Sequence, residues 1–179
     1  MPPNPTAIDI ILAEIEKALD VRLYYLAIVT ALTLPGICAA LETPGGDTTG
    51  HDKESYVKWY DAHLAKKFSF LTALDCYRLR CGGIHQGKFG HKNMRYDRAV
   101  FLLPNPTGRT VIFQENNLIG VPPNQVVAFS AEIFCRYIIK AVQTWFSANQ
   151  SNKIVQENLE KLVQYRNGYG AISGYPVIA

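Results

Sequence analysis

The sequence predicts a mainly α-helical fold, an antiparallel bundle of about five helices with a small β-hairpin inserted near residues 98–114. Two observations predict this class. Apolar residues recur at helical spacing over most of the chain, whereas a short stretch in its second half changes to partly β-branched apolar runs around a turn rich in proline and glycine. At 179 residues, with 48% hydrophobic and 18% charged residues, the chain fits one globular domain over 1–179.

The first predicted helix begins at a capping box, Thr6-Ala-Ile-Asp9. It runs to about Leu34, and Pro35 is expected to end or kink it. The uncharged run from Leu23 to Leu41 is nearly long enough to cross a bilayer, but tyrosines and threonines dilute it and Pro35 interrupts it. We therefore expect a buried core helix and no membrane. The apolar residues at helical spacing are Ile8, Ile11, Leu12, Ile15, Leu19 and Leu23.

Two further helices are predicted after a loop at residues 43–52. The first is short and amphipathic, and its apolar residues are Tyr56, Val57, Trp59, Tyr60 and Leu64. Ser69 is expected to cap the second, whose apolar stripe is Phe70, Leu74, Tyr77, Cys81 and Ile84.

The predicted hairpin pairs Ala99–Leu103 with Thr110–Phe113 across the loop at 104–108. A long helix is expected to start at Pro122-Pro123-Asn124, and a last short helix follows it. The tail, residues 167–179, is expected to be flexible or docked on the surface because of its glycines and proline. The long helix carries Val127, Ala131, Phe134, Ile138, Val142 and Trp145 on one face, and the last one carries Val155, Leu159, Leu162 and Val163.

The four cysteines are scattered, and three of them lie in apolar helical patterns, which predicts reduced, buried thiols in a cytoplasmic protein. The N-terminal residues do not have the pattern of a signal peptide. The spacing of Cys76, Cys81, His85 and His91 is too tight for a zinc finger, so we expect no metal and no cofactor.

The candidate functional motif is Arg78-Leu-Arg80-Cys-Gly-Gly-Ile-His85, near the end of a predicted helix. An arginine that stays charged can hold a phosphate, and a histidine that titrates near neutrality can move a proton. Residues 78–98 hold six cations and one acid, a net charge of +5 within a chain of +3, so the rest of the chain sums to −2. Such local basicity is typical of a phosphate-binding site.

The spacing leaves open which arginine accompanies His85. On an ideal continuous helix Arg78 and His85 share a face, whereas Arg80 lies on the opposite flank of the apolar stripe. The pair Gly82-Gly83 favours a helix end or a distortion here, which would change this relation.

Arg80-x4-His85 resembles the Arg-x4–6-His signature of the HEPN superfamily of helical nucleotide-binding domains. The stretches "LTLPGICAALE", "YVKWYDAHL" and "DCYRLRCGGIHQG" are similar to a bacterial group of uncharacterised HEPN-like proteins. This resemblance covers the helical parts of residues 6–166. Cys81 stands where the family usually has a polar residue.

The resemblance implies a homodimer in which the motifs of two chains face each other. It also implies metal-independent cleavage of RNA and an antitoxin-type protein partner. His85 would then transfer the proton of the ribose 2′-hydroxyl, and Arg80, or Arg78 in its place, would steady the phosphate.

Two alternatives stay open, a HEPN-like module that binds RNA, a nucleotide or a protein without cleavage, and a structural helical dimer with no ligand. The basic cluster at residues 88–98 is expected either to contact the phosphates of a nucleic-acid backbone or to be a solvated surface. Its candidate phosphate- or RNA-binding residues are Lys88, His91, Lys92 and Arg95. The alternatives to a functional role for the motif arginines are that Arg78 and Arg80 are solvated, or that Arg78 pairs with Asp75 at i, i+3.

Overall fold

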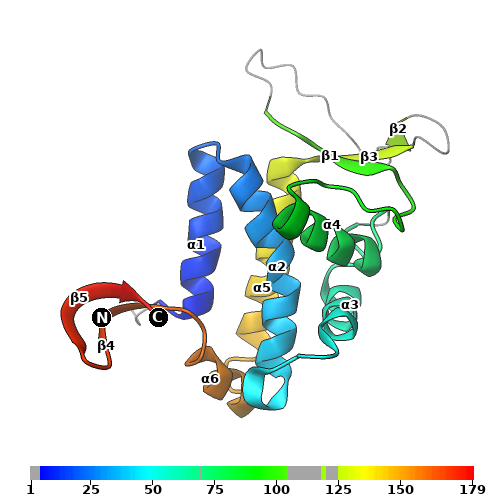
Figure 1. The fold of residues 1–179 in the computed structure, drawn as a ribbon. Helices are drawn as coiled ribbons and strands as arrows, with labels where there is room; N and C mark the ends of the chain where they lie inside the picture. The colour runs from blue at the N-terminus through cyan, green and yellow to red at the C-terminus, as the bar shows by residue number, and fades with distance from the viewer. Residues whose placement is uncertain (1–4, 69, 105–117, 120–124) are drawn as a thin grey trace.

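The computed structural model describes residues 5–68, 70–104, 118–119 and 125–179. Within these residues the chain is mainly helical, as predicted, with two small β-sheets (Figure 1). The α-helices are α1 (Ala7–Asp20), α2 (Tyr24–Glu42), α3 (Asp52–His63), α4 (Ala73–Gln86), α5 (Ala131–Ala148) and α6 (Lys153–Leu159), and η1 (Pro44–Gly46) is a 3-10 turn. The strands are β1 (Arg98–Leu102), β2 (Leu118–Ile119), β3 (Val126–Ser130), β4 (Tyr165–Tyr169) and β5 (Ile172–Ile178).

The predicted N-terminal helix is in fact two helices. Its capping box is confirmed, because the Asp9 amide donates to Thr6 Oγ1 (3.2 Å) and the Thr6 amide donates to Asp9 Oδ2 (2.9 Å). The chain then turns at Arg22, whose φ of 62° is left-handed. Neither a glycine nor a proline marks this turn, so the apolar pattern alone does not reveal it.

Pro35 lies inside α2 and does not end it, since the helix continues to Glu42. A proline removes one backbone hydrogen bond and crowds the preceding turn. Two side-chain hydroxyls donate hydrogen bonds to backbone carbonyls in that turn. The Tyr56 hydroxyl donates to the Leu32 carbonyl (3.0 Å), and the Thr33 hydroxyl donates to the Thr30 carbonyl (2.7 Å).

α2 is the centre of the fold and packs against α1, α3, α4, α5 and α6. In the described part of the chain it is the one helix that is long and apolar enough to cross a membrane by length and composition. Half of that apolar window is buried inside the fold, as expected for a core helix.

The strand pairing differs from the predicted hairpin. The second predicted strand, Thr110–Phe113, lies outside the described residues. β1 pairs in parallel with β3, from Arg98↔Val126 to Leu102↔Ser130, and β2 pairs antiparallel with β3. The prediction of helix at 126–130 is therefore wrong. Its Val-Val-Ala-Phe sequence suits a strand, and pairing with β1 overrides the helical pattern.

α5 begins at Ala131 because Ser130 caps it, its hydroxyl accepting the Ile133 amide (3.4 Å). The predicted apolar face of this helix is confirmed from that point on. Its predicted members Ala131, Phe134, Ile138, Val142 and Trp145 are all buried.

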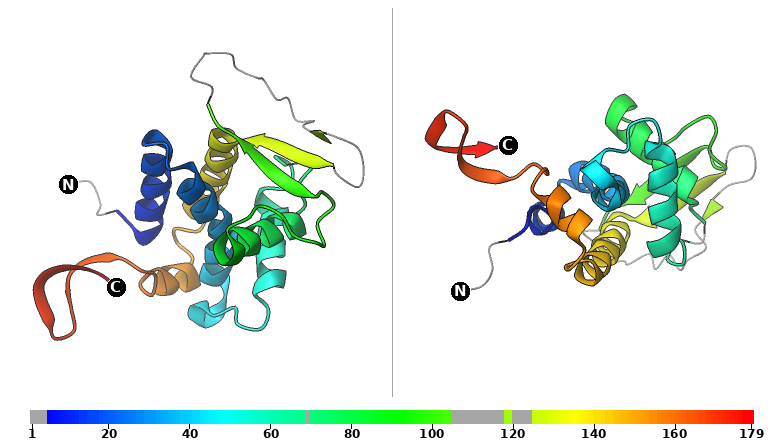
Figure 2. Two further views of the ribbon diagram at one scale, coloured as in Figure 1. Left: turned by 45° about the horizontal axis from the view of Figure 1, so that its top comes forward. Right: turned by 90° about the horizontal axis from the view of Figure 1, so that it is seen from below.

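The tail forms a hairpin of β4 and β5 that the sequence analysis does not predict. It projects from the helical body near α6 (Figure 2). Its first residue, Tyr165, donates a hydrogen bond to the Glu14 carboxylate of α1.

The C-terminus of α2 depends on Asn158 of α6. The buried Asn158 amide donates to the carbonyls of Leu41 (3.0 Å) and Thr43 (2.8 Å), and its oxygen accepts from Lys161 (2.9 Å). Helix C-termini leave carbonyls without intrahelical partners, so this side chain replaces the missing donors.

We expect Asn158→Ala to lower the free energy of unfolding by about 2–3 kcal/mol, because it removes the donor to the buried Leu41 carbonyl and one of the two donors to the Thr43 carbonyl. Chemical denaturation monitored by circular dichroism measures the change. Gln156→Ala, an exposed change on the same helix, is the control and should shift it by less than about 0.5 kcal/mol. Equal effects of both changes would contradict the capping role.

Candidate functional site

α4 carries the arginine–histidine motif on one uninterrupted helix. Thr72 caps it in a capping box with Asp75, in place of the predicted Ser69, which lies outside the described residues. The helix runs through Gly82-Gly83 to Gln86, so the expected end or distortion at the glycine pair is wrong.

The buried stripe of α4 is not the predicted one. The predicted Leu74, Tyr77 and Cys81 are half-buried, and Ile84 is exposed. The side that faces the core is formed by smaller residues. These buried residues are Ala73, Asp75, Cys76, Leu79, Gly82 and Gly83.

The continuity of α4 decides the relation among the motif residues. Arg78 and His85 are seven positions apart and point about 20° apart around the helix axis, about 10 Å apart along it. Arg80 and His85 point about 140° apart. Within one chain His85 therefore shares a face with Arg78 and not with Arg80.

Arg78 is bound to the protein itself. Its Nη1 donates to the Asn93 carbonyl and lies 3.8 Å from the buried Asp75 carboxylate. The Nε of Arg95 approaches the same carboxylate at 3.5 Å, and its Nη2 donates to the Phe70 carbonyl (2.8 Å). The Arg78–Asp75 pairing considered from the sequence is present, and these two arginines hold the segment after α4 against the helix.

Arg80 lies on the side of α4 that faces α3. Its Nη1 is 3.9 Å from Asp52 Oδ2, and its guanidinium lies 5.6 Å from the centre of the Tyr77 ring. The Nε–H of Arg80 is buried and has no hydrogen-bond partner among the described residues. The Tyr77 hydroxyl donates to Asp52 Oδ2 (2.7 Å). This bond and the nearby Arg80 charge lower the pKa of Asp52, while burial and the same bond raise the pKa of Tyr77.

His85 lies in the last turn of α4 and is exposed. Gly87 ends the helix in the left-handed conformation, with a φ of 64°. The Lys88 amide then donates back to the Gly82 carbonyl (3.1 Å), so the chain reverses direction over the helix.

The segment from Lys88 to Arg98, here called the basic loop, packs against α4. Two glycines of that helix, Gly82 and Gly83, leave room for it. A Cβ at Gly82 would stand 2.6 Å from the Lys88 carbonyl and 3.1 Å from the Gly90 carbonyl. A Cβ at Gly83 would stand 3.2 Å from the Phe89 ring. The glycine pair predicts a helix end or a distortion, whereas in the structure both glycines lie within α4 and leave room for the loop.

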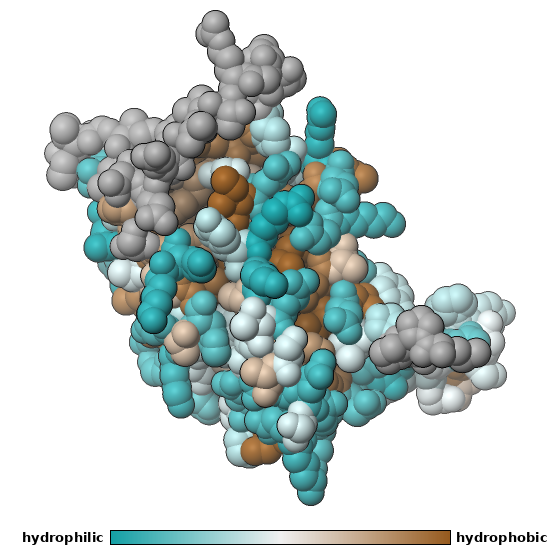
Figure 3. All heavy atoms as spheres, turned by 180° about the vertical axis from the view of Figure 1, so that it is seen from behind, coloured by the Kyte–Doolittle hydropathy of each residue, from teal (hydrophilic) through white to brown (hydrophobic). Residues whose placement is uncertain are grey.

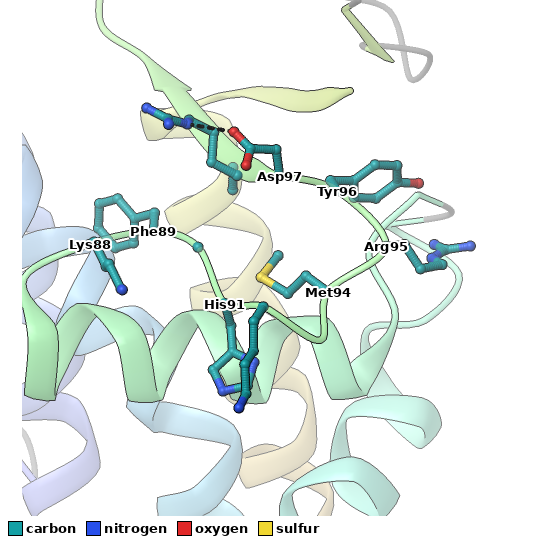
Figure 4. Close-up of a pocket in the computed structure, with 11 residues that line it drawn as sticks. Lys88, Phe89, His91, Met94, Arg95, Tyr96 and Asp97 are labelled. Atoms are coloured by element: carbon teal, nitrogen blue, oxygen red, sulfur yellow. Dashed lines mark hydrogen bonds and ion pairs between the residues drawn. The ribbon is translucent and has the colours of Figure 1, made fainter. Parts of the chain in front are cut away.

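The basic loop borders a depression of about 750 Å³ that brings together all four residues predicted to bind phosphate or RNA. Figure 4 shows His91 on one side of it, Asp97 on the opposite side and Met94 between His91 and Arg95. Its lining includes four cations and one acid, namely Lys88, Lys92, Arg95, Arg98 and Asp97, together with His91. Arg98 is counted in the charge of the segment but is not among the residues predicted for the site.

The four cations that line the depression differ in how firmly other residues of the protein hold them. Arg95 contacts Asp75 and donates to the Phe70 carbonyl, whereas Arg98, among the described residues, pairs with its exposed neighbour Asp97 (3.1 Å). Lys88 and Lys92 are exposed. His91 accepts the Asn93 amide at Nδ1 (3.2 Å), which leaves its Nε2 as the nitrogen that can donate.

The remaining reactive groups do not form a second centre in the described residues. The four cysteines are free thiols, and burial raises the pKa of Cys135 to about 12. No group of three metal-ligating side chains occurs within the described part of the chain.

No protein-family model, curated protein or solved structure matches this chain.

We expect Gly82→Ala to destabilise the protein, because its methyl group would collide with two backbone carbonyls of the basic loop. The gain in helix propensity is about 1 kcal/mol and overpacking costs about 1–3 kcal/mol, so the expected difference is a net loss of up to about 2 kcal/mol. Thermal and chemical denaturation measure it.

Gly36→Ala in α2 is the matched control, since its Cβ would meet only the Tyr56 ring at an ordinary 3.6 Å. That change should leave stability unchanged or raise it by up to about 1 kcal/mol. If Gly82→Ala also stabilised the protein, the close approach of the loop would not hold in solution.

Proposed function

We propose that this protein is a HEPN-like, cytoplasmic helical-bundle protein that binds RNA through the basic loop. The observation that carries the proposal is the clustering of Lys88, Lys92 and Arg98 around one depression, in a chain whose charge outside residues 78–98 sums to −2. A localised basic surface attracts polyanions without making the whole protein a non-specific polyanion binder.

The chemistry of the depression favours the phosphate backbone over a base or a small nucleotide. Lysine and arginine side chains dominate the lining, and the nearby Tyr96 is buried, so it presents no ring face for base stacking. Among the described residues, Lys88, Lys92 and Arg98 are the lining cations that contact no buried acid, whereas Asp75 holds Arg78 and Arg95. Binding of this kind positions RNA with little dependence on sequence.

A second candidate function is metal-independent RNA cleavage, favoured by the exposure of His85 beside an apolar surface. The Tyr25 hydroxyl donates to the Gly83 carbonyl (2.7 Å), which joins the start of α2 to the end of α4. Large apolar side chains are exposed around this junction, and they are Val21, Leu23, Leu26 and Ile84. This surface suits the homodimer that the HEPN resemblance implies.

In that cleavage, His85 would take the proton of a ribose 2′-hydroxyl while the 2′-oxygen attacks the neighbouring phosphorus. The 5′-oxygen of the next nucleotide would leave with a proton supplied by solvent, and the product would carry a 2′,3′-cyclic phosphate. An arginine must stabilise the charge of the phosphorane. Because Asp75 and the Asn93 carbonyl hold Arg78, and Arg80 points about 140° away from His85 on α4, that arginine would be Arg80 of a second chain.

For the binding function, we expect Lys88→Gln/Lys92→Gln to weaken binding of a single-stranded mixed-sequence RNA by about tenfold at 50 mM salt. The slope of log Kd against log salt concentration should fall by about 1.4, since each phosphate contact contributes about 0.7. Fluorescence anisotropy over a salt series measures both quantities.

The matched control is Lys140→Gln/Lys153→Gln, which removes the same charge from exposed positions on α5 and α6. It should leave the affinity within about twofold of the wild type. Equal weakening by both pairs would assign binding to net charge and reject the basic loop as the site.

For the cleavage function, we expect the wild type to cut RNA in EDTA and to leave cyclic-phosphate ends, with His85→Ala and Arg80→Ala both inactive. Each substitution should leave the RNA affinity within about twofold, because neither residue lines the depression. Binding without cleavage by the wild type over a range of RNAs would leave the binding function standing and exclude the nuclease.

A further inference from the structure

The depression beside the basic loop has one acid among its described lining residues, Asp97. Exposed polar side chains are common on this protein, and they cover much of the face opposite to that of Figure 1 (Figure 3). Exposure alone therefore gives an acid no role. Asp97 differs from other exposed acids because it lies in a depression whose remaining charged groups are cations.

A carboxylate is unfavourable on a surface that binds phosphates. Its charge repels the phosphates of RNA and of DNA alike, and so opposes the attraction of Lys88, Lys92 and Arg98. A carboxylate can only accept hydrogen bonds. Asp97 therefore favours binding only of a ligand that offers it a donor.

The ion pair with Arg98 does not account for Asp97. The Nε of Arg98 donates to Asp97 Oδ2 (3.1 Å), but the two side chains are 66% and 47% exposed. Exposed pairs of this kind contribute little to stability. The bond also uses one of the roughly four lone-pair positions of a carboxylate, which leaves acceptor capacity for a ligand.

Backbone contacts hold Asp97 in place without its side chain. Its amide donates to the Gln125 carbonyl (2.9 Å), and a Cβ at Gly90 would stand 3.0 Å from its carbonyl oxygen. The Ala99 amide donates to the Phe89 carbonyl (2.9 Å). These contacts join the two ends of the basic loop, so the acceptor is positioned before a ligand binds.

Donors and the acceptor lie on different sides of the depression. Figure 4 shows Asp97 opposite His91, with Lys88 to one side. A ligand here meets donors for phosphate oxygens and, across from His91, an acceptor for a hydroxyl group. Each nucleotide of RNA carries both a phosphate and a 2′-hydroxyl, whereas DNA lacks the hydroxyl.

We propose that Asp97 accepts a hydrogen bond from a ribose 2′-hydroxyl and thereby selects RNA over DNA at the basic loop. The proposal rests on the binding function proposed above, since Lys88 and Lys92 must hold the phosphates. Amino groups of bases are also donors. RNA and DNA of the same sequence share those groups, so a preference between the two must come from the sugar.

The test compares three single strands of one sequence that contains only A and C, namely RNA, DNA and 2′-fluoro RNA. The 2′-fluoro strand keeps the RNA-like sugar conformation but has no 2′ donor. Each protein also carries His85→Ala, so that cleavage does not remove the RNA. We expect this parent protein to bind RNA about five- to tenfold more tightly than either other strand, as one hydrogen bond to a charged group would give. Fluorescence anisotropy measures the three affinities.

Three variants of the parent separate the acceptor from the charge. Asp97→Ala should bind the three strands within about twofold of one another, and should bind DNA more tightly than the parent because the repulsion is gone. Asp97→Asn keeps an oxygen acceptor without the charge and should retain a preference for RNA of at least about twofold. Asp61→Ala, which removes an exposed acid of α3 outside the depression, is the control and should keep the preference of the parent.

Equal binding of the three strands by the parent, or an Asp97→Ala variant that still prefers RNA, would overturn the proposal. A preference shared by RNA and 2′-fluoro RNA would assign selection to the sugar conformation and would also overturn it. Equal binding that is still weakened by Lys88→Gln/Lys92→Gln would reject the role of Asp97 and leave the binding function standing. A parent that binds no RNA would reject both.

Discussion

The burial of α2 is the constraint on which the rest of the structure depends. From Tyr24 to Leu41 this helix has no charged side chain, and it contacts the five other α-helices. A helix that is apolar nearly all round can be stable in water only when other elements surround it. The amphipathic helices α1 and α5 each present one apolar face to the core that surrounds it.

The polar backbone of α2 then fixes how its neighbours are placed. The Tyr56 hydroxyl of α3 donates to the Leu32 carbonyl in the turn before Pro35. The Asn158 amide of α6 donates to the Leu41 carbonyl at the C-terminal end of α2. The Tyr25 hydroxyl in the first turn of α2 bonds the Gly83 carbonyl and so holds the last turns of α4. The position of the candidate site is thus a consequence of how the core helix is covered.

The sequence predicts the features that are local. The capping box at Thr6, the buried face of α5 and the gathering of Lys88, His91, Lys92 and Arg95 all follow from short-range patterns or from counting charges. The parallel pairing of β1 with β3 joins residues 28 positions apart, and no local pattern contains it. The stripe of α4 is mispredicted because its core side is built from Cys76 and two glycines, which hydrophobicity does not identify as a packing face.

Two arginines of the candidate site are held by a buried acid, and the other cations are not. Asp75 is buried, and a buried carboxylate needs compensating partners, which Arg78 and Arg95 supply. Drawing either arginine toward a phosphate would leave that carboxylate less compensated. Arg80 is partly compensated by the nearby Asp52 carboxylate, whose pKa is lowered by the Tyr77 hydrogen bond and by the Arg80 charge. A phosphate at Arg80 would compete with that carboxylate, whereas Lys88, Lys92 and Arg98 contact no buried acid among the described residues. In the proposed functions, the basic loop would therefore bind phosphates within one chain, and joint action of Arg80 and His85 on one phosphate would require two chains.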